Sequence, residues 1–536
     1  MIEPSEQSSP PREPAGRRAL GVLLKPLAID VRSLAGFRIG VATMLLVDLA
    51  CRAVDLGDHY TDRGVFPRAA RLALEHSDIF EGEARYEWSL HMLSGEPWAQ
   101  AVMFLIAAAF AVGMLVGYRT RLCTAASWLL LVSLHVRNPV LIDAGDTLLR
   151  SIMFWSMFVP LGAAASVDRR RRPSAGEPRR EVLSIGGAAL LLQIAMMYWC
   201  TAAAKNHPTW HEEYSAVYYA LSIDSLATPF GQWLLHYPAL LRALTKITYW
   251  LEWLGPCVAL CPGLTRWPRA VTVFAFWILH TGMTLTLEVG VLEWIVNAVW
   301  LVYLPGVFWD AIGRTAICRR LAAWQDSSLA RRIVAALDRS IFRRPARPDF
   351  RQSRVGAAFV TVCLLYIAAW NIHETFASVK EAVHLPKGWR IPGRAMGLAQ
   401  WWFMFAPSPM TCDGWFVMKG FLEDGSVVNL WSPHEPLPLT KPPSVAETYI
   451  NQRWRRFLMY MWEPYYADSL PDLAHWLQRR WDEQYSLGQP GRKVKSVEIM
   501  YYIEETLPPG RISPLITPMI LWKSEYEAFT KPKAGG

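Results

Sequence analysis

The sequence predicts an α-helical polytopic membrane bundle of about nine spans, followed by a C-terminal α+β extramembrane domain. First, hydrophobic residues make up 52% of the 536 residues and the mean hydropathy is +0.14, which is too apolar for an ordinary soluble protein of this size. Second, these residues cluster in stretches that meet or approach the roughly 20 residues needed to cross about 30 Å of hydrocarbon. Third, after about Val379 the long apolar stretches give way to Gly, Pro and alternating apolar residues.

The candidate spans are separated by polar connections. The third and eighth candidate spans are short enough to be buried or re-entrant helices. The number of membrane crossings is therefore open by one or two. The nine stretches are residues 34–52, 98–117, 122–136, 147–165, 183–204, 244–262, 270–287, 289–307 and 355–374.

The spans divide the chain into five parts. We expect a disordered cytoplasmic tail, a main transmembrane domain, a basic cytoplasmic linker, a last transmembrane helix and an extracytoplasmic α+β domain. Their respective boundaries are 1–29, 30–310, 311–354, 355–375 and 376–536.

The charges of the connections orient the bundle. Lys and Arg concentrate in alternate connections, for example Tyr118–Arg121, Arg169–Arg172 and the loop after the eighth span, and such segments stay in the cytoplasm. The opposite connections are acidic. The basic connections all fall on the cytoplasmic side if the N-terminus is inside, and an odd number of spans then places the C-terminal domain outside. We expect a multi-pass protein of the cytoplasmic (inner) membrane, if the source is bacterial.

The lipid bilayer is the first partner that the composition predicts. The net charge of +9 does not indicate nucleic-acid binding, because the basic residues lie mainly where the positive-inside bias already explains them. The eight cysteines include no C-x-x-C pair and lie mostly in or beside apolar stretches, which favours buried thiols. We therefore predict no metal site.

The C-terminal part shows both strand and helix patterns. Trp415–Leu430 reads as two strands joined through Glu423–Gly425, because Asp-Gly favours a tight hairpin turn. A helical stretch follows over Val445–Gln484, and Lys493–Glu505 alternates again as a strand. The chain contains no P-loop, G-x-G-x-x-G or H-E-x-x-H motif.

Lys205 is the most informative ionisable residue near a span. It ends the apolar run QIAMMYWCTAAAK on the side that the positive-inside rule disfavours for lysine. In a partly dry pocket its neutral amine is favoured, and such a lysine can abstract protons. The alternative is a lysine that snorkels to the lipid headgroups.

Other polar residues in the bundle have both functional and structural explanations. Glu252 lies among aromatic residues and can serve catalysis or a buried ion pair. His280 shares a helical face with Thr284 and Glu288, and a hydrogen-bonded core histidine is the alternative. The outer connection between the third and fourth spans is unusually polar, which also fits a network that closes a re-entrant turn. Its polar residues are His135, Arg137, Asn138, Asp143, Asp146 and Arg150.

Several short motifs occur together in the bundle and just after it. They are Asp30-x-Arg32, Gly117–Arg121, Arg137–Asp146, Ala204–Trp210, His280, Leu304-Pro305, Trp401–Pro407 and Asp413–Trp415. Together these motifs resemble the HTTM domain, the bacterial branch of the vitamin K-dependent gamma-carboxylase superfamily. The resemblance covers about residues 25–310 and extends to a segment after the bundle.

The resemblance implies a reaction and a set of roles. Lys205 matches the lysine that deprotonates reduced vitamin K, so the cofactor is expected to be reduced vitamin K or menaquinone, with oxygen and carbon dioxide as co-substrates. Oxygenation of the quinone then produces a strong base that removes a glutamyl γ-proton, and the carbanion adds carbon dioxide. The resemblance places His280, Glu252, His135 and Asn138 at the quinone site, and Trp402 and Met404 near the substrate.

These observations leave three classes of function open. The first is a quinone-dependent carboxylase, or a related oxygen-dependent enzyme, that modifies an exported peptide or protein. The second is a non-enzymatic scaffold or maturation factor for exported proteins. A transporter ranks last, because the sequence has no matching pair of helices broken by Gly or Pro.

Overall fold

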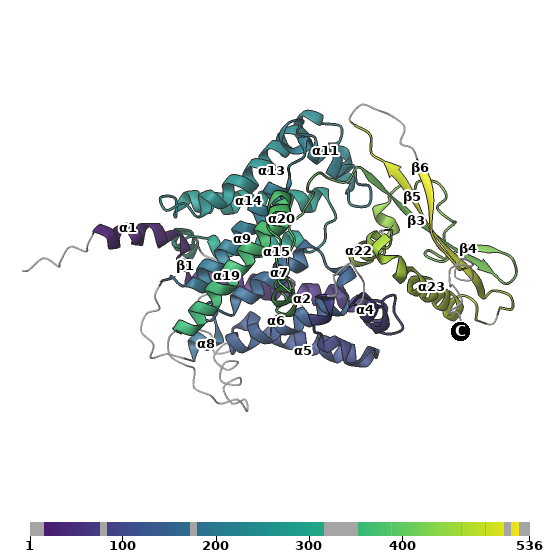
Figure 1. Ribbon diagram of the computed structural model, residues 1–536, viewed down its shortest axis with the longest axis horizontal. Coiled ribbons are helices and arrows are strands. Elements are labelled where there is room, and N and C mark those ends of the chain that lie inside the picture. The colour runs from purple at the N-terminus through teal and green to yellow at the C-terminus, as the bar shows by residue number, and fades with distance from the viewer. Residues whose placement is uncertain are drawn as a thin grey trace, which may run out of the picture.

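The computed structural model is mostly helical, at 62%, with a small sheet region near the C-terminus (Figure 1). It describes residues 15–75, 83–171, 180–315, 352–386, 388–462, 464–487, 489–508 and 516–524. Residues 1–14 of the predicted tail and 316–351 of the predicted linker lie outside the described residues. Within the tail that we expected to be disordered, Ala15–Leu24 forms helix α1, since this stretch is rich in Ala, Leu and Arg, which favour helix.

Each of the nine apolar stretches contains a helix. Several boundaries differ from the predicted ones: some helices begin earlier in the chain, whereas the helices in 147–165 and 289–307 end before the apolar stretch does. The helices are α2 (Val31–Val54), α5 (Pro97–Val116), α6 (Thr120–Arg137), α7 (Ala144–Ser156), α9 (Ile185–Ala204), α13 (Pro238–Ala259), α14 (Trp267–Thr286), α15 (Leu292–Trp300) and α19 (Arg354–Thr375).

Four of these helices, α2, α5, α9 and α19, are long and apolar enough to cross a membrane. A fifth span results if α15 with its 3-10 extension is joined to α16 (Gly306–Gly313), which is bent from it by 96°. By contrast, α7 has only 13 residues, and α13 carries Arg242, Lys246 and Glu252. The count of nine spans therefore stays a prediction.

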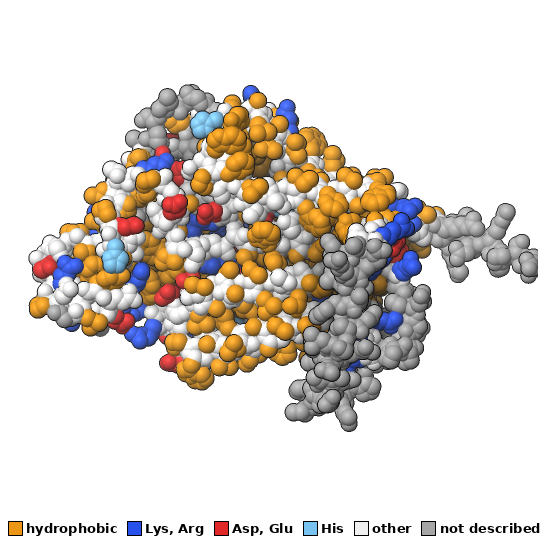
Figure 2. Space-filling view, turned by 180° about the vertical axis from the view of Figure 1, so that it is seen from behind, with side chains coloured by type: hydrophobic (Ala, Val, Ile, Leu, Met, Phe, Trp, Pro, Cys, Tyr) orange, Lys and Arg blue, Asp and Glu red, His pale blue; other side chains and the backbone are white. Residues whose placement is uncertain are grey.

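The helices that are less apolar overall still expose apolar stripes. On α14, Val271, Ile278 and Leu285 are each more than half exposed, and they recur at the spacing of one helical face. Ile247 and Leu254 form a similar stripe on α13. Hydrophobic side chains also cover much of the bundle on the face shown in Figure 2, whereas charged side chains gather toward its two ends. Such a surface is typical of contact with lipid.

The connections predicted to face the cytoplasm meet at one end of the bundle. There the short strands β1 (Ile29–Asp30) and β2 (Glu181–Val182) pair, and α8 (Val167–Arg170) lies at the same end in Figure 1. Side chains join the connections to one another. These contacts are Arg38 to the Ala165 carbonyl (2.6 Å), Thr120 to Asp168 (2.7 Å), Arg269 to the Pro26 carbonyl (3.0 Å) and Arg32 to Asp310 (2.7 Å).

The connections predicted to face outward meet at the other end, against the C-terminal domain. The backbone N–H of Ser225 donates to Asp413 at 2.7 Å, and Lys441 pairs with Asp224 at 2.6 Å. The Tyr218 hydroxyl donates to the Leu507 carbonyl at 3.2 Å. The two sets of connections thus lie at opposite ends of the bundle.

The C-terminal domain packs two helices against an antiparallel sheet. The sheet order is β4 (Val427–Asn429), β3 (Cys412–Leu422), β5 (Val494–Glu505) and β6 (Ile516–Lys523). Gly425, at φ +83°, makes the turn between β3 and β4. The helices are α22 (Gln452–Met461) and α23 (Leu470–Gln484), whose apolar faces supply much of the core. The predicted hairpin and later strand are confirmed, the predicted helical stretch is divided between α22 and α23, and β6 was not predicted.

Four buried charged residues fasten this domain to the bundle, and we call them the charge cluster: Asp48, Arg52, Asp146 and Arg453. Arg453 on α22 donates to Asp146 on α7 at 2.5 Å and to Asp48 on α2 at 2.7 Å. Arg52 donates to the same two carboxylates, at 2.6 and 2.8 Å. All four side chains are at most 3% exposed. Two positive and two negative charges therefore balance inside the junction.

Replacing Arg453 by Met should destabilise the protein by about 3–5 kcal/mol, because it leaves a buried carboxylate without its full complement of cations. The loss should appear as a lower midpoint of thermal unfolding in detergent. Arg63→Met is the control. Arg63 pairs with Glu483 where the two side chains are 73% and 60% exposed, so its loss should cost less than about 1 kcal/mol. Equal effects of the two substitutions would contradict the importance of the cluster.

Stability should also fall in acid. His59, on the short helix α3 (Leu56–Tyr60), is buried beside Trp454 of α22, with ring centroids 4.4 Å apart. Burial, with help from Arg453 and Arg52, lowers the pKa of His59 from 6.5 to about 3. The unfolded chain therefore binds the proton first, and stability should drop by about 1.4 kcal/mol per pH unit as pH falls from 6.5 toward 3.

The pH dependence can be assigned to His59 by substitution. Unfolding midpoints measured between pH 7.5 and 4.5 should fall less steeply for His59→Phe than for the wild type, because Phe has no proton to bind. His236, which is exposed, provides the control variant His236→Phe, whose slope should match the wild type. An unchanged slope in His59→Phe would show that other groups dominate the acid response.

Candidate functional site

Lys205 lies one residue beyond the end of α9, and its side chain is buried. Its Nζ donates to both carboxylate oxygens of Glu252 on α13, at 2.6 and 2.5 Å. The lysine side chain is 3% exposed and the glutamate side chain 9%. Lys205 therefore faces a protein carboxylate, and the position expected of a lysine that snorkels to lipid headgroups is not observed.

The indole ring of Trp210 covers one side of the pair formed by Lys205 and Glu252. The Lys205 Nζ lies 4.2 Å from the centroid of the Trp210 ring, a cation–π contact. Trp210 belongs to the short helix α10 (Pro208–His211), which begins at Pro208 with His207 as its cap. The indole N–H of Trp210 donates to the Phe405 carbonyl at 3.0 Å. The segment 401–407, after the bundle, thus helps to hold the ring over the lysine.

Two opposing effects act on the protonation of Lys205. Burial lowers the pKa of its ammonium group, because the charged form loses hydration, and this effect exceeds the opposing attraction of Glu252. The pair is arranged so that the amine can accept a proton while the carboxylate stabilises the resulting cation.

His280 lies in a separate hydrogen-bonded network. On α14, its Nδ1 contacts Glu293 of α15, and its Nε2 is 2.8 Å from the Tyr198 hydroxyl on α9. The indole N–H of Trp300 donates to the same hydroxyl at 2.9 Å. Both ring nitrogens of His280 are therefore engaged, as expected for a core histidine. Tyr198 had not been singled out from the sequence, although it lies about two helical turns before Lys205.

His135 and Asn138 lie near the charge cluster instead. The Asn138 side-chain amide donates to the His59 carbonyl at 2.9 Å. His135 Nε2 is 3.7 Å from Asp146, beyond hydrogen-bonding distance. The structure therefore does not bring the four residues predicted for a quinone site into one group. Glu252 contacts Lys205, His280 has its own network, and the other two lie at the junction with the C-terminal domain.

The two residues predicted to lie near the substrate point different ways. Trp402 is 2% exposed and donates to the Gln400 side chain at 2.9 Å, so it belongs to the bundle core. Met404 lines a cavity at the junction of the bundle and the C-terminal domain. Simple alternation would place Trp402 and Met404 on the same face of the segment. Instead the chain turns at Met404 and Phe405, where Phe405 has φ +53°, and Met404 lines the cavity together with the exposed Trp401 and Phe403.

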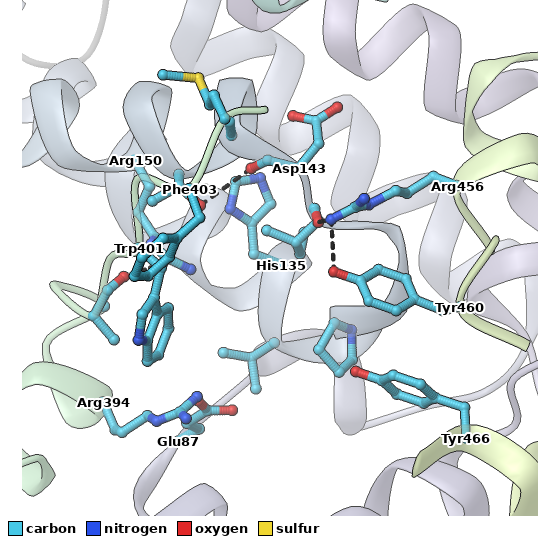
Figure 3. Close-up of a pocket in the computed structure, with 18 residues that line it drawn as sticks. Glu87, His135, Asp143, Arg150, Arg394, Trp401, Phe403, Arg456, Tyr460 and Tyr466 are labelled. Carbon is cyan, nitrogen blue, oxygen red and sulfur yellow. Dashed lines mark hydrogen bonds and ion pairs between the residues drawn. The ribbon is translucent and has the colours of Figure 1, made fainter. Parts of the chain in front are cut away.

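This junction cavity has a volume of about 400 Å³, which suits a small molecule or one side chain of a larger ligand. Its walls come from the connection between α6 and α7, from the segment 394–404 and from α22 (Figure 3). The labelled residues include His135, Arg150, Trp401, Arg456 and Tyr460. Lys205 does not line this cavity.

Potential metal ligands also meet beside the cavity. One ligand atom each from Asp48, His135 and Asp146 lies within 4.8 Å of the others. Both carboxylates already accept charged hydrogen bonds from Arg52 and Arg453. We therefore interpret these carboxylates as partners of the arginines.

Comparisons with known proteins identify no relative of this chain. No protein-family model matches the chain, and searches of curated proteins and of solved structures found no similar protein. The family resemblance therefore rests on the sequence motifs alone.

The pairing of Lys205 with Glu252 predicts a characteristic pattern of stability changes. Lys205→Met should lower the unfolding free energy by about 3–5 kcal/mol, because it leaves a buried carboxylate alone. Adding Glu252→Gln should restore part of the loss, since the unpaired charge is then removed. Unfolding midpoints of the wild type, both single variants and the double variant give the coupling. Additive effects of the two substitutions would contradict the ion pair.

Proposed function

We propose that this protein is a multi-pass membrane enzyme in which Lys205 acts as a general base toward a reduced quinone, in an oxygen-dependent modification of an exported peptide or protein. The observation that carries the proposal is the burial of Lys205 against Glu252 and under Trp210. The motif resemblance suggests a gamma-carboxylase-like reaction with reduced vitamin K or menaquinone as cofactor and oxygen and carbon dioxide as co-substrates.

The residues around Lys205 fit such a cofactor. A hydroquinone has a planar ring and an acidic hydroxyl group, and it supplies the electrons for reaction with oxygen when bound. The Trp210 ring, whose centroid lies 4.2 Å from Nζ, provides an aromatic surface beside the lysine. Lys205 and Glu252 are the groups that would hold the hydroxyl end.

The protein groups have distinct tasks in this proposal. The neutral amine of Lys205 accepts a proton at Nζ, and its lowered pKa makes this form accessible. Glu252, 2.5 Å away, stabilises the ammonium group that results. Trp210 and the segment 401–407 exclude water, which preserves the reactivity of a strong base.

The membrane arrangement is also part of the proposal. Four apolar helices support a membrane location. The exposed apolar stripes of α13 and α14, and the separation of basic from acidic connections at two ends, support nine crossings with the N-terminus inside. The C-terminal domain and Lys205 would then lie on the outer side, where an exported substrate is accessible.

Oxygen uptake by the purified protein tests the proposal. With reduced menaquinone or vitamin K hydroquinone, the wild type should consume oxygen and form quinone epoxide. Lys205→Arg should lower the rate at least about 100-fold, because arginine keeps the charge and the pairing with Glu252 but does not deprotonate. Lys246→Arg is the matched control, since Lys246 lies over an aromatic ring, Tyr214, but is exposed.

The same assay separates the alternatives. Uptake that is lost only in Lys205→Arg supports the enzyme. Absence of uptake with every quinone tested, from protein that is folded, would favour the non-enzymatic scaffold for exported proteins instead.

A further inference from the structure

The side chains that line the junction cavity carry more positive charge than negative charge. We propose that it binds an organic carboxylate with a flat apolar body, held by Arg150 and Arg456 from opposite walls. The inference goes beyond the proposed quinone chemistry, because Lys205 does not line the cavity and binding there requires no turnover.

Arg150, on α7, presents the first guanidinium group. Its Nη2 donates to the Ala399 carbonyl at 2.7 Å, and its Nε is buried without a hydrogen-bond partner. Within the part of the chain that the structure describes, it forms no ion pair. A partly buried guanidinium group held only by a carbonyl retains N–H groups that can donate to an anion.

Arg456, on α22, presents the second guanidinium group. It donates to the Ile142 carbonyl at 3.2 Å and to the Tyr460 hydroxyl at 2.6 Å. Among the described residues no carboxylate lies within ion-pair distance of it. Figure 3 shows Arg150 and Arg456 on opposite sides of His135. Two cations from different domains thus face one space.

His135 adds an independent indication of a ligand. It lines the cavity and is 1% exposed, and neither ring nitrogen has a hydrogen-bond partner. A buried polar group without a partner is costly, so such groups are rare unless a ligand or water satisfies them. An anion between the arginines could accept a hydrogen bond from the protonated nitrogen of this ring.

Charge and shape indicate the class of ligand. Three arginines and two carboxylates line the cavity, which leaves one positive charge for a monoanion if the histidine is neutral. This balance favours a carboxylate over a phosphate dianion. The aromatic rings of Trp401, Phe403 and Tyr460 form much of the remaining wall and suit a flat apolar body.

Calorimetric titration of the full chain in nanodiscs tests the proposal, with benzoate as the probe and benzamide as its neutral isostere. Benzoate should bind and benzamide should bind at least about tenfold more weakly, because the amide lacks the charge-assisted hydrogen bonds. Arg150→Gln and Arg456→Gln should each weaken benzoate binding about tenfold or more. Arg242→Gln, which alters an exposed arginine on α13, should leave it unchanged.

Two further measurements guard against misfolding and against a less specific anion site. Arg456→Lys keeps the charge and should retain more affinity than Arg456→Gln, a difference that general loss of structure would not produce. Inorganic phosphate should not displace benzoate at equal concentration. Equal binding of benzoate and benzamide, insensitivity to both Gln substitutions, or displacement by phosphate would each overturn the assignment.

Discussion

Two arginines and two aspartates, buried where the C-terminal domain meets the helices, determine how the rest of the molecule is arranged. Arg453 is the only member contributed by the domain, and it reaches carboxylates on α2 and α7 at once. Buried charges are costly unless they are paired with good geometry, so this contact selects one orientation of the domain. That orientation brings α22 to the connection between α6 and α7, and the junction cavity forms between them.

The two candidate sites lie on either side of one extended segment. Trp401, Phe403 and Met404 line the cavity, and the next residue, Phe405, accepts a hydrogen bond from the Trp210 ring that covers Lys205. The segment follows the last apolar helix, so the bundle and the domain both limit its position. A ligand in the cavity could therefore influence the environment of the lysine through this short stretch of backbone.

Much of the architecture follows from local sequence patterns, whereas the sites depend on contacts between distant segments. Apolar runs located all nine helices, and the Asp-Gly turn located the β3–β4 hairpin, because these signals are local. No local pattern reveals that Glu252 meets Lys205, that Tyr198 meets His280, or that Arg453 pairs with Asp48 and Asp146. Strand β6 was missed because its apolar residues follow Pro-rich sequence and a proline lies within it.

A quinone bound beside Lys205 would be detected there by photo-crosslinking. An azido-menaquinone, reduced and bound to the protein in nanodiscs, would be irradiated and the labelled peptides identified by mass spectrometry. We expect labels on residues 198–214 and on α13 near Glu252, and their loss when unmodified menaquinol competes. Labels confined to exposed apolar residues of α5 and α19, such as Leu105 and Val362, and unaffected by competition would mean that the probe only dissolves in lipid and would contradict binding beside Lys205.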